Sequence, residues 1–127
     1  MRATVQHFEL PARDLERAAR FYREALGWEV APLTWQGPPY FRIRAALPDP
    51  SGVARQGIDG GLTTGGEAVG QPLLMIHVEG ATLEECLERI VDAGGAVDLP
   101  VQEVSGQGRF ARFLDSEGNR LGLWEKA

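Results

Sequence analysis

The sequence of 127 residues has a single cysteine, Cys86, so no intramolecular disulfide is possible. We interpret Cys86 as a small, half-buried apolar side chain, because no basic neighbour at helical spacing is found that would lower its pKa. No apolar run approaches the ~18–20 residues that span a membrane, and no signal-peptide pattern is expected at the N-terminus. The net charge of −5 argues against nucleic acid, whose binding proteins carry a clustered basic face. We therefore expect a cytoplasmic protein with neither membrane nor nucleic acid as a partner.

What the sequence does contain is a repeated plan. Residues 7–30 and residues 75–97 match when Met75 is aligned with His7. Each stretch consists of an alternating segment, a polar turn, an amphipathic segment, a glycine and a further short apolar segment. This order predicts strand, helix and strand twice, and indicates a duplicated module. A cleft between two such modules would suit a small molecule.

Alternation in the first strand predicts which side chains meet the helix. Phe8 and Leu10 fall on one face of the strand, and His7 and Glu9 fall on the other. We expect the face with Phe8 and Leu10 to pack against the apolar stripe of the helix. His7 and Glu9 are then left on the opposite side of the sheet.

Both helices carry recognisable signals at their ends. Asp14 is expected to cap the first helix and Gly27 to end it. Thr82 and Glu85 are expected to form a capping box on the second helix, which should stop at Gly94 and Gly95. The predicted apolar stripes are Leu15, Ala19, Tyr22 and Leu26 in the first helix, and Leu83, Leu87 and Ile90 in the second.

Further alternating segments complete the two modules. They lie at residues 28–30, 40–47, 58–64, 73–80, 97–104, 109–114 and 120–125. The order is then βαβββ twice, which is an α+β arrangement with the helices on one face of a mixed sheet. We expect residues 1–127 to form one domain, with one module over about residues 1–66 and the other over about residues 71–127.

Turn residues separate the strands. Segment 48–57 is expected to be the most flexible part of the chain, and segment 65–72 to link the modules. A tight turn is expected at Asp115–Asn119, where Gly118 and Asn119 are residues that tolerate positive φ.

Four stretches together resemble the glyoxalase / bleomycin-resistance / extradiol-dioxygenase group, the vicinal oxygen chelate superfamily. They are the helix pattern D-L-x-x-A-x-x-F-Y-x-x-x-L-G, the segments IDGGLT and LLMIHVEG, and the ending D-x-x-G-N-x-x-x-L-W. The similarity covers nearly the whole chain and is greatest to the single-domain glyoxalase-like proteins of bacteria. It implies that the two modules form a curved sheet, or cup, with the helices outside. It also implies a homodimer.

In the enzymatic members, the resemblance implies a divalent metal held by one ligand from each of four strands. His7 occupies the first of these positions, and Gly61, Leu73 and Gly122 occupy the others. Glycine and leucine have no side-chain donor, so we expect no family-type metal site and no other cofactor. Glu125 does not replace Gly122, because it lies on the opposite face of an alternating strand.

The residues expected to line the cup and bind a ligand are His7, Glu9, Leu73, Met75, His77, Gly122 and Trp124. Trp124 either stacks on a ligand or packs against a partner subunit. His7, Glu9 and His77 form a metal-binding triad if the two first strands converge, and His7 with Glu9 otherwise suits a general base and its partner. Trp35 and Tyr40 lie near a loop, and Arg42 and Arg44 are interpreted as solvated or carboxylate-binding.

Three functions follow from the resemblance. The first is binding of a small molecule in a metal-free cup. The second is a metal-dependent lyase, isomerase or dioxygenase with a rearranged site around His7. The third is sequestration of an antibiotic, as in bleomycin-resistance proteins. The sequence leaves open whether the protein is an enzyme at all.

Overall fold

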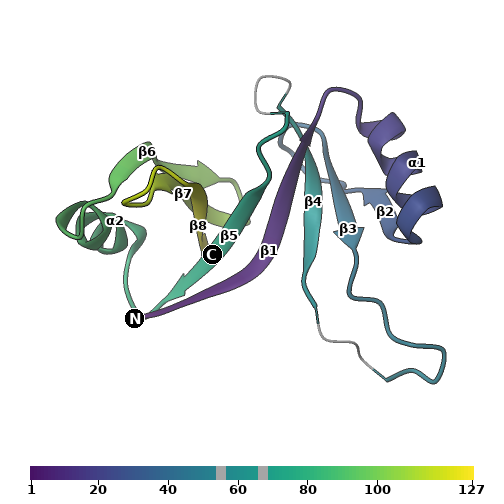
Figure 1. Cartoon of the computed structure of the whole chain (residues 1–127), viewed down its shortest axis with the longest axis horizontal. Coiled ribbons are helices and arrows are strands. Elements are labelled where there is room, and N and C mark those ends of the chain that lie inside the picture. Colours follow the sequence, from purple (N-terminus) through teal and green to yellow (C-terminus); the bar gives the residue numbers. More distant parts are fainter. Residues whose placement is uncertain (54–56, 66–68) are drawn as a thin grey trace. The chain divides into compact units, whose positions relative to one another are not determined.

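The computed structural model describes residues 1–53, 57–65 and 69–127 of the chain (Figure 1). Within these ranges the elements are β1 (Arg2–Ala12), α1 (Leu15–Leu26), β2 (Glu29–Pro32), β3 (Tyr40–Arg44), β4 (Asp59–Thr64), β5 (Leu73–Glu79), α2 (Leu83–Asp92), β6 (Ala96–Val104), β7 (Gly108–Leu114) and β8 (Arg120–Lys126). The order βαβββ occurs twice, so the predicted α+β class with two modules is confirmed. Parts of segments 48–57 and 65–72, namely 54–56 and 66–68, lie outside the described residues, so those two predictions stay untested.

The chain divides into two compact units. Residues 7–72 form the N-terminal unit, and residues 1–6 together with 73–127 form the C-terminal unit. No helix in the described residues is long and apolar enough to cross a membrane. The single-domain assignment stays a prediction.

Both units repeat one strand order, β2-β3-β4-β1 in the N-terminal unit and β5-β8-β7-β6 in the C-terminal unit. In each, the first strand of the module runs parallel to the last, and the other pairs are antiparallel. The predicted mixed sheet is therefore confirmed. The register pairs His7 with Asp59 in the N-terminal unit and Met75 with Gly122 in the C-terminal unit.

The helix ends follow the predicted signals. The Asp14 carboxylate accepts a hydrogen bond from the Arg17 amide at 2.9 Å, and Gly27 ends α1 with φ 68°. Thr82 and Glu85 form the complete capping box on α2, with bonds of 3.0 and 3.1 Å. The predicted N-caps of both helices and the end of α1 at Gly27 are confirmed. Helix α2 ends slightly earlier than predicted, at Asp92 with Ala93 as its C-cap, and Gly94 follows with φ 104°.

One local prediction was wrong. Leu26, placed on the apolar stripe of α1, is 55% exposed. The predicted turn at Asp115–Asn119 is present, with Gly118 at φ 85° and no positive φ at Asn119. The Asn119 amide donates a hydrogen bond to Asp115 Oδ1 at 2.8 Å. The Asp115 carboxylate organises the turn, so a second left-handed residue is not required.

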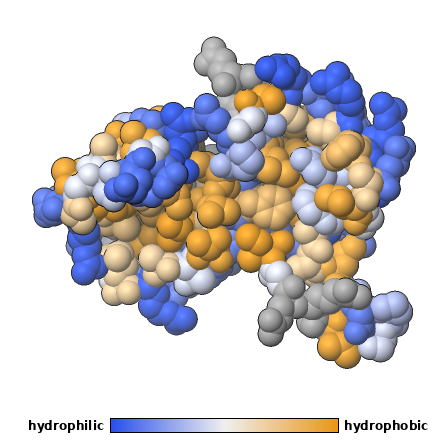
Figure 2. Space-filling model, viewed as in Figure 1, coloured by the Kyte–Doolittle hydropathy of each residue, from blue (hydrophilic) through white to orange (hydrophobic). Residues whose placement is uncertain are grey.

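Each unit has its own apolar core between its helix and its sheet. The N-terminal core includes Ala19, Val30, Phe41, Ile43 and Leu62, with Phe8 and Leu10 packed against it. The C-terminal core includes Val78, Leu83, Cys86, Leu87, Ala111, Phe113 and Leu123. Side chains on the outer surface of α1 are largely hydrophilic (Figure 2). The predicted packing of the Phe8 and Leu10 face on the helix is confirmed, and the opposite sheet faces carry the candidate site residues.

Candidate functional site on the sheet faces opposite the helices

The sheet face of the N-terminal unit opposite α1 is polar. Alternation places side chains from three neighbouring strands on it: His7 and Glu9 from β1, Tyr40 and Arg42 from β3, and Asp59 from β4. Glu9 lies opposite Gly61 in one strand pair, and Arg42 lies opposite Gly61 in the next. His7 and Glu9 therefore share their face with acidic, basic and phenolic groups.

The ring of Tyr40 covers Gly61. A Cβ atom added at Gly61 would overlap the hydroxyl oxygen and Cζ of Tyr40. The Tyr40 hydroxyl also makes a hydrogen bond with the Glu9 carboxylate. The space beside Gly61 is thus filled by a side chain from the neighbouring strand, and any larger residue at Gly61 would have to displace it.

Burial is the main reason why the pKa of Tyr40 lies above its ordinary value, and the charge of Glu9 and the hydrogen bond to it raise this pKa further. We therefore predict that the Tyr40 phenol stays protonated near pH 10, where an unperturbed tyrosine ionises. The tyrosinate absorbance of the wild-type protein minus that of Tyr40→Phe should stay flat through this range while both remain folded. A difference that rises with an ordinary tyrosine midpoint would contradict the buried Tyr40–Glu9 contact.

The corresponding face of the C-terminal unit is mainly apolar. Met75 is only 2% exposed, and its Sδ atom covers Gly122, where an added Cβ would overlap it. The same Cβ would lie 3.2 Å from Leu73 Cδ2. In the next row His77 lies opposite Trp124. The structure thus brings together five predicted ligand residues: Leu73, Met75, His77, Gly122 and Trp124.

The imidazole of His77 is partly buried in this face. Burial lowers the pKa of His77, and the smaller effect of the Glu79 charge acts in the opposite direction. His77 is therefore favoured in its neutral form, which can donate one hydrogen bond and accept another.

Two residues on this face, Phe110 and Arg112, were not selected from the sequence. In β7 they alternate with the core residues Ala111 and Phe113, so they lie on the face away from α2. Phe110 lies opposite Trp124, and Arg112 lies opposite Gly122. The alternation in RFARFL was a signal that could have found them.

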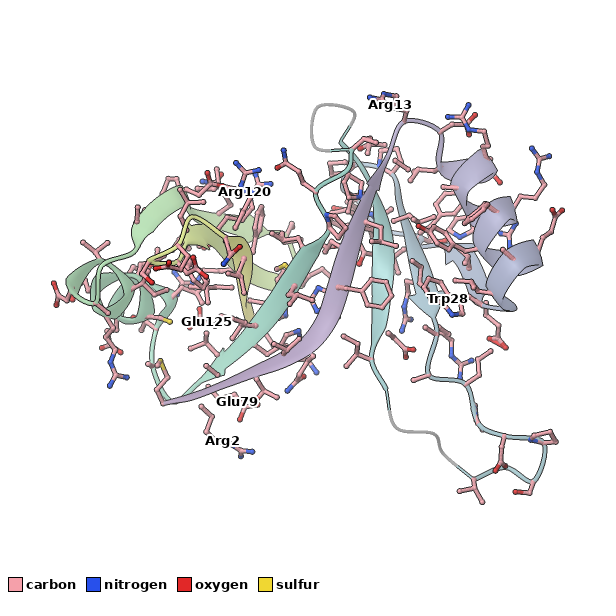
Figure 3. The ribbon with its side chains drawn as sticks, viewed as in Figure 1. Arg2, Arg13, Trp28, Glu79, Arg120 and Glu125 are labelled. Carbon is pink, nitrogen blue, oxygen red and sulfur yellow. The ribbon has the colours of Figure 1, made fainter. Side chains whose placement is uncertain are left out.

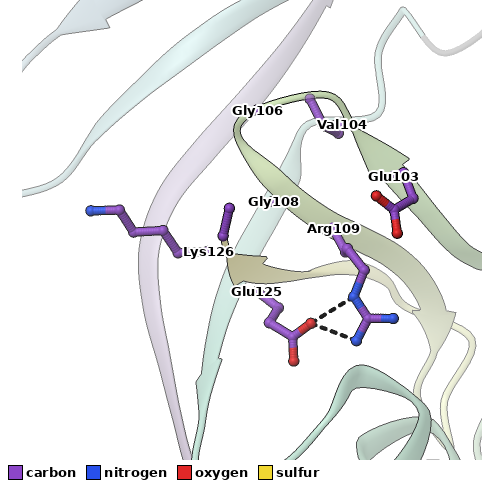
Figure 4. A pocket seen from close by; sticks show the side chains of 8 residues that line it. Glu103, Val104, Gly106, Gly108, Arg109, Glu125 and Lys126 are labelled. Carbon is purple, nitrogen blue, oxygen red and sulfur yellow. Dashed lines mark hydrogen bonds and ion pairs between the residues drawn. The ribbon is translucent and has the colours of Figure 1, made fainter.

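A shallow pocket of about 200 Å³ lies elsewhere in the C-terminal unit and is lined in part by Glu103, Gly108, Arg109 and Glu125 (Figure 4). Arg109 donates to Glu125 Oε2 at 2.7 Å and to both carboxylate oxygens of Glu84 on α2, at 2.7 and 3.2 Å. Two carboxylates therefore neutralise one guanidinium, which ties β7 and β8 to the start of α2. The ion pair between Arg109 and Glu125 also confirms that Glu125 lies on the helix side of β8, on the face opposite Gly122. Glu125 and Arg120, near the two ends of β8, are labelled in Figure 3.

This cluster predicts a stability loss in acid. The hydrogen bonds from Arg109 hold the pKa of Glu84 below its ordinary value. A folded-state pKa below the unfolded one means that the contact stabilises the protein above the unfolded pKa of about 4.3, and that this contribution is lost as pH falls through the folded value. The Tm of Glu84→Gln should therefore decrease less than the Tm of the wild type when the pH is lowered from about 5 to about 3. Glu88→Gln, at an exposed position on the same helix, is the matched control, and parallel Tm curves for Glu84→Gln and the wild type would refute the assignment.

Cys86 differs from its prediction in two respects. It is 4% exposed, hence buried rather than half-buried. Arg89 lies one helical turn further along α2 and acts to lower the pKa of Cys86, although burial acts more strongly and the net pKa is raised. The interpretation of Cys86 as an apolar core residue agrees with its place in the C-terminal core.

Known proteins resemble the chain in sequence over its first part and in fold over nearly its whole length. The bleomycin resistance protein-like N-terminal family matches residues 4–37. Methylmalonyl-CoA epimerase of Streptomyces coelicolor, in complex with 2-nitronate-propionyl-CoA, superposes with a TM-score of 0.65 at 18% identity, covering 98% of this chain and 97% of that one. The methylmalonyl-CoA epimerase of Mycobacterium tuberculosis superposes with a TM-score of 0.61 at 17% identity, covering 98% of this chain and 88% of that one. The chain has the vicinal oxygen chelate fold. The resemblance seen in the sequence is thereby confirmed.

Another solved structure of the vicinal oxygen chelate fold, a hypothetical protein of Bacillus halodurans C-125, superposes with a TM-score of 0.65 at 13% identity, covering 98% of this chain and 95% of that one. No curated protein matches the sequence. At these identities the solved structures establish the fold and leave the function to be argued from the residues.

The residues at the four implied metal positions of the vicinal oxygen chelate fold do not suit a metal. Only His7 has a side-chain donor, and the spaces beside Gly61 and Gly122 are filled by Tyr40 and Met75. In the described part of the chain, no three His, Cys, Asp or Glu side chains gather as a metal site would need. The alternative triad of His7, Glu9 and His77 gains no support.

Proposed function

We propose that this protein of the vicinal oxygen chelate fold binds a small molecule on the sheet faces opposite its helices, without the metal of the enzymatic members. The observation that carries the proposal is the covering of Gly61 by Tyr40 and of Gly122 by Met75. Each filling side chain comes from a strand next to the glycine, so neither position leaves room for a longer, metal-binding side chain.

The polar and aromatic groups beside these glycines support a binding role. The N-terminal face offers Glu9, Tyr40 and Arg42 as hydrogen-bonding groups, and the C-terminal face offers the rings of Trp124 and His77. A mainly apolar surface with a few oriented polar groups is typical of small-molecule sites. His7, Glu9, Leu73, Met75, His77, Gly122 and Trp124 remain our proposed ligand-binding residues.

One observation favours a second candidate, antibiotic sequestration. The family that matches residues 4–37 is described as bleomycin resistance protein-like. Binding without catalysis needs no metal and is compatible with the filled positions at Gly61 and Gly122. We propose a cytoplasmic homodimer in either case, and sedimentation equilibrium would test the dimer.

Ligand-induced thermal shifts in the presence of a chelator test the proposed function. Small aldehydes, aromatic acids and antibiotics are each added at increasing concentration. A ligand that binds only the folded state stabilises it more as its concentration rises, by about 2.7 kcal/mol at a hundred times its Kd. We expect one class to raise Tm with chelator present, and Trp124→Leu to reduce the shift. Phe21→Ala, which is 60% exposed on α1, is the control that should leave the shift unchanged. A shift that appears only after metal is added would overturn the proposal, as would no shift with any class.

A further inference from the structure

Two arginines share one aspartate on the sheet face of the C-terminal unit. Arg120 Nε lies 3.0 Å from Asp98 Oδ2, and Arg112 Nε lies 4.0 Å from the same oxygen. The Asp98 carboxylate is therefore shared between two guanidinium groups, and its ion pair with Arg112 is the longer of the two. The three side chains are 21% to 39% exposed, which leaves the guanidinium group of Arg112 within reach of a ligand.

A local irregularity in β6 places Asp98 in this cluster. Val97 pairs with Phe113 and Leu99 pairs with Arg112, so Asp98 is an extra residue without a partner on β7. Such a bulge turns a side chain away from the regular alternation, and bulges are common next to binding sites. β6 is the last strand in the order and contains Pro100, which an edge strand tolerates.

Arg112 is incompletely satisfied. Its Nε atom is buried and has no hydrogen-bond partner within the described residues, and its ion pair with Asp98 is long. Leaving a charged donor buried without an acceptor costs free energy, so such a group favours a ligand or water that supplies the missing oxygen. The planar guanidinium suits a carboxylate, which can accept two parallel hydrogen bonds from it.

Next to this cation the same face is apolar. Arg112 lies opposite Gly122, whose neighbour on β5 is Met75. One row further along, Phe110 lies opposite Trp124. An aromatic or other apolar group lying on these side chains would bring an attached carboxylate towards Arg112, because the two rows are adjacent in the sheet.

We propose that Arg112 and Arg120, held by Asp98, form a subsite for the carboxylate of a small aromatic acid whose ring packs against Phe110 and Trp124. This inference rests on the proposed function and names the class of ligand that the C-terminal face accepts. Burial lowers the pKa of His77 and so favours its neutral form, and the guanidinium group of Arg112 is the cation that we assign to the carboxylate.

Binding of phenylacetate and of its uncharged analogue phenylacetamide, each followed by calorimetry, tests the subsite. We expect phenylacetate to bind more tightly, and Arg112→Met to weaken phenylacetate by roughly ten- to a hundredfold while hardly changing phenylacetamide. Arg112→Lys should recover only part of the loss, because lysine keeps the charge but not the fork. Arg44→Met, on the N-terminal unit and paired with Glu29, is the control for loss of a positive charge.

The outcomes separate the subsite from the proposed function. Equal affinity for the acid and the amide, or an Arg112→Met affinity equal to that of the wild type, would overturn the subsite and leave small-molecule binding standing. If neither compound binds the wild-type protein, the aromatic-acid assignment is wrong. The proposed function then falls only if the wider thermal-shift panel also gives no ligand. Circular dichroism of Arg112→Met excludes unfolding as the cause of any loss.

Discussion

Met75→Ala is expected to lower the free energy of unfolding by about 2–5 kcal/mol, because it removes a long side chain from a fully packed position. Met75 is 2% exposed, and its sulfur fills the space over Gly122. Urea denaturation followed by fluorescence would measure the change. Leu74→Ala is the matched control, because Leu74 is adjacent in the chain but 47% exposed, and a change within about 0.5 kcal/mol is expected there.

A double-mutant cycle with Gly122→Ala makes this prediction specific to the contact. Gly122→Ala alone should destabilise by about 1–3 kcal/mol, since its new Cβ would overlap the sulfur of Met75. In the Met75→Ala background the methyl group enters vacated space, and it should cost nothing or increase stability. Strict additivity of the two substitutions would show that Met75 does not occupy the space beside Gly122.

Leu62→Ala is the second large effect, again about 2–5 kcal/mol, and it reports on the N-terminal unit. Leu62 is 1% exposed on β4 and belongs to the core that packs against α1. Leu26→Ala should cost no more than about 0.5 kcal/mol, because Leu26 is 55% exposed although helical spacing had placed it on the apolar stripe of α1. Comparable losses from the two substitutions would contradict the burial of Leu62 or the exposure of Leu26.

The regular periodicities predicted most of the fold. Alternation along β1 predicted that Phe8 packs against the helix and that His7 lies on the opposite face of the sheet, because successive side chains of a strand point to opposite faces. The capping box at Thr82 and Glu85 was equally predictable, since it depends on residues three apart in the chain. The predicted burial of Leu26 was wrong, because helical spacing gives the direction of a side chain around the helix but does not show whether a strand lies beneath it.

The contents of the candidate site depended on strand register, which the sequence did not provide. The sequence showed that Gly61 and Gly122 lack metal donors, but not that Tyr40 and Met75 fill the space beside them. That knowledge requires the pairing of β3 with β4 and of β5 with β8. The bulge at Asp98 is still harder to predict from the sequence. An extra residue moves side chains to the other face of the sheet, and the composition of the strand gives no sign of it.

Elemental analysis tests the central claim, that this fold binds its ligand without the family's metal, most directly. Protein purified without chelators is incubated with Mn²⁺, Fe²⁺, Co²⁺ or Zn²⁺, freed of excess metal by gel filtration and analysed beside His7→Ala. The filled positions at Gly61 and Gly122 predict far less than one metal ion per chain, with no difference between the two proteins. One metal ion per chain in the wild type, lost in His7→Ala, would contradict the account.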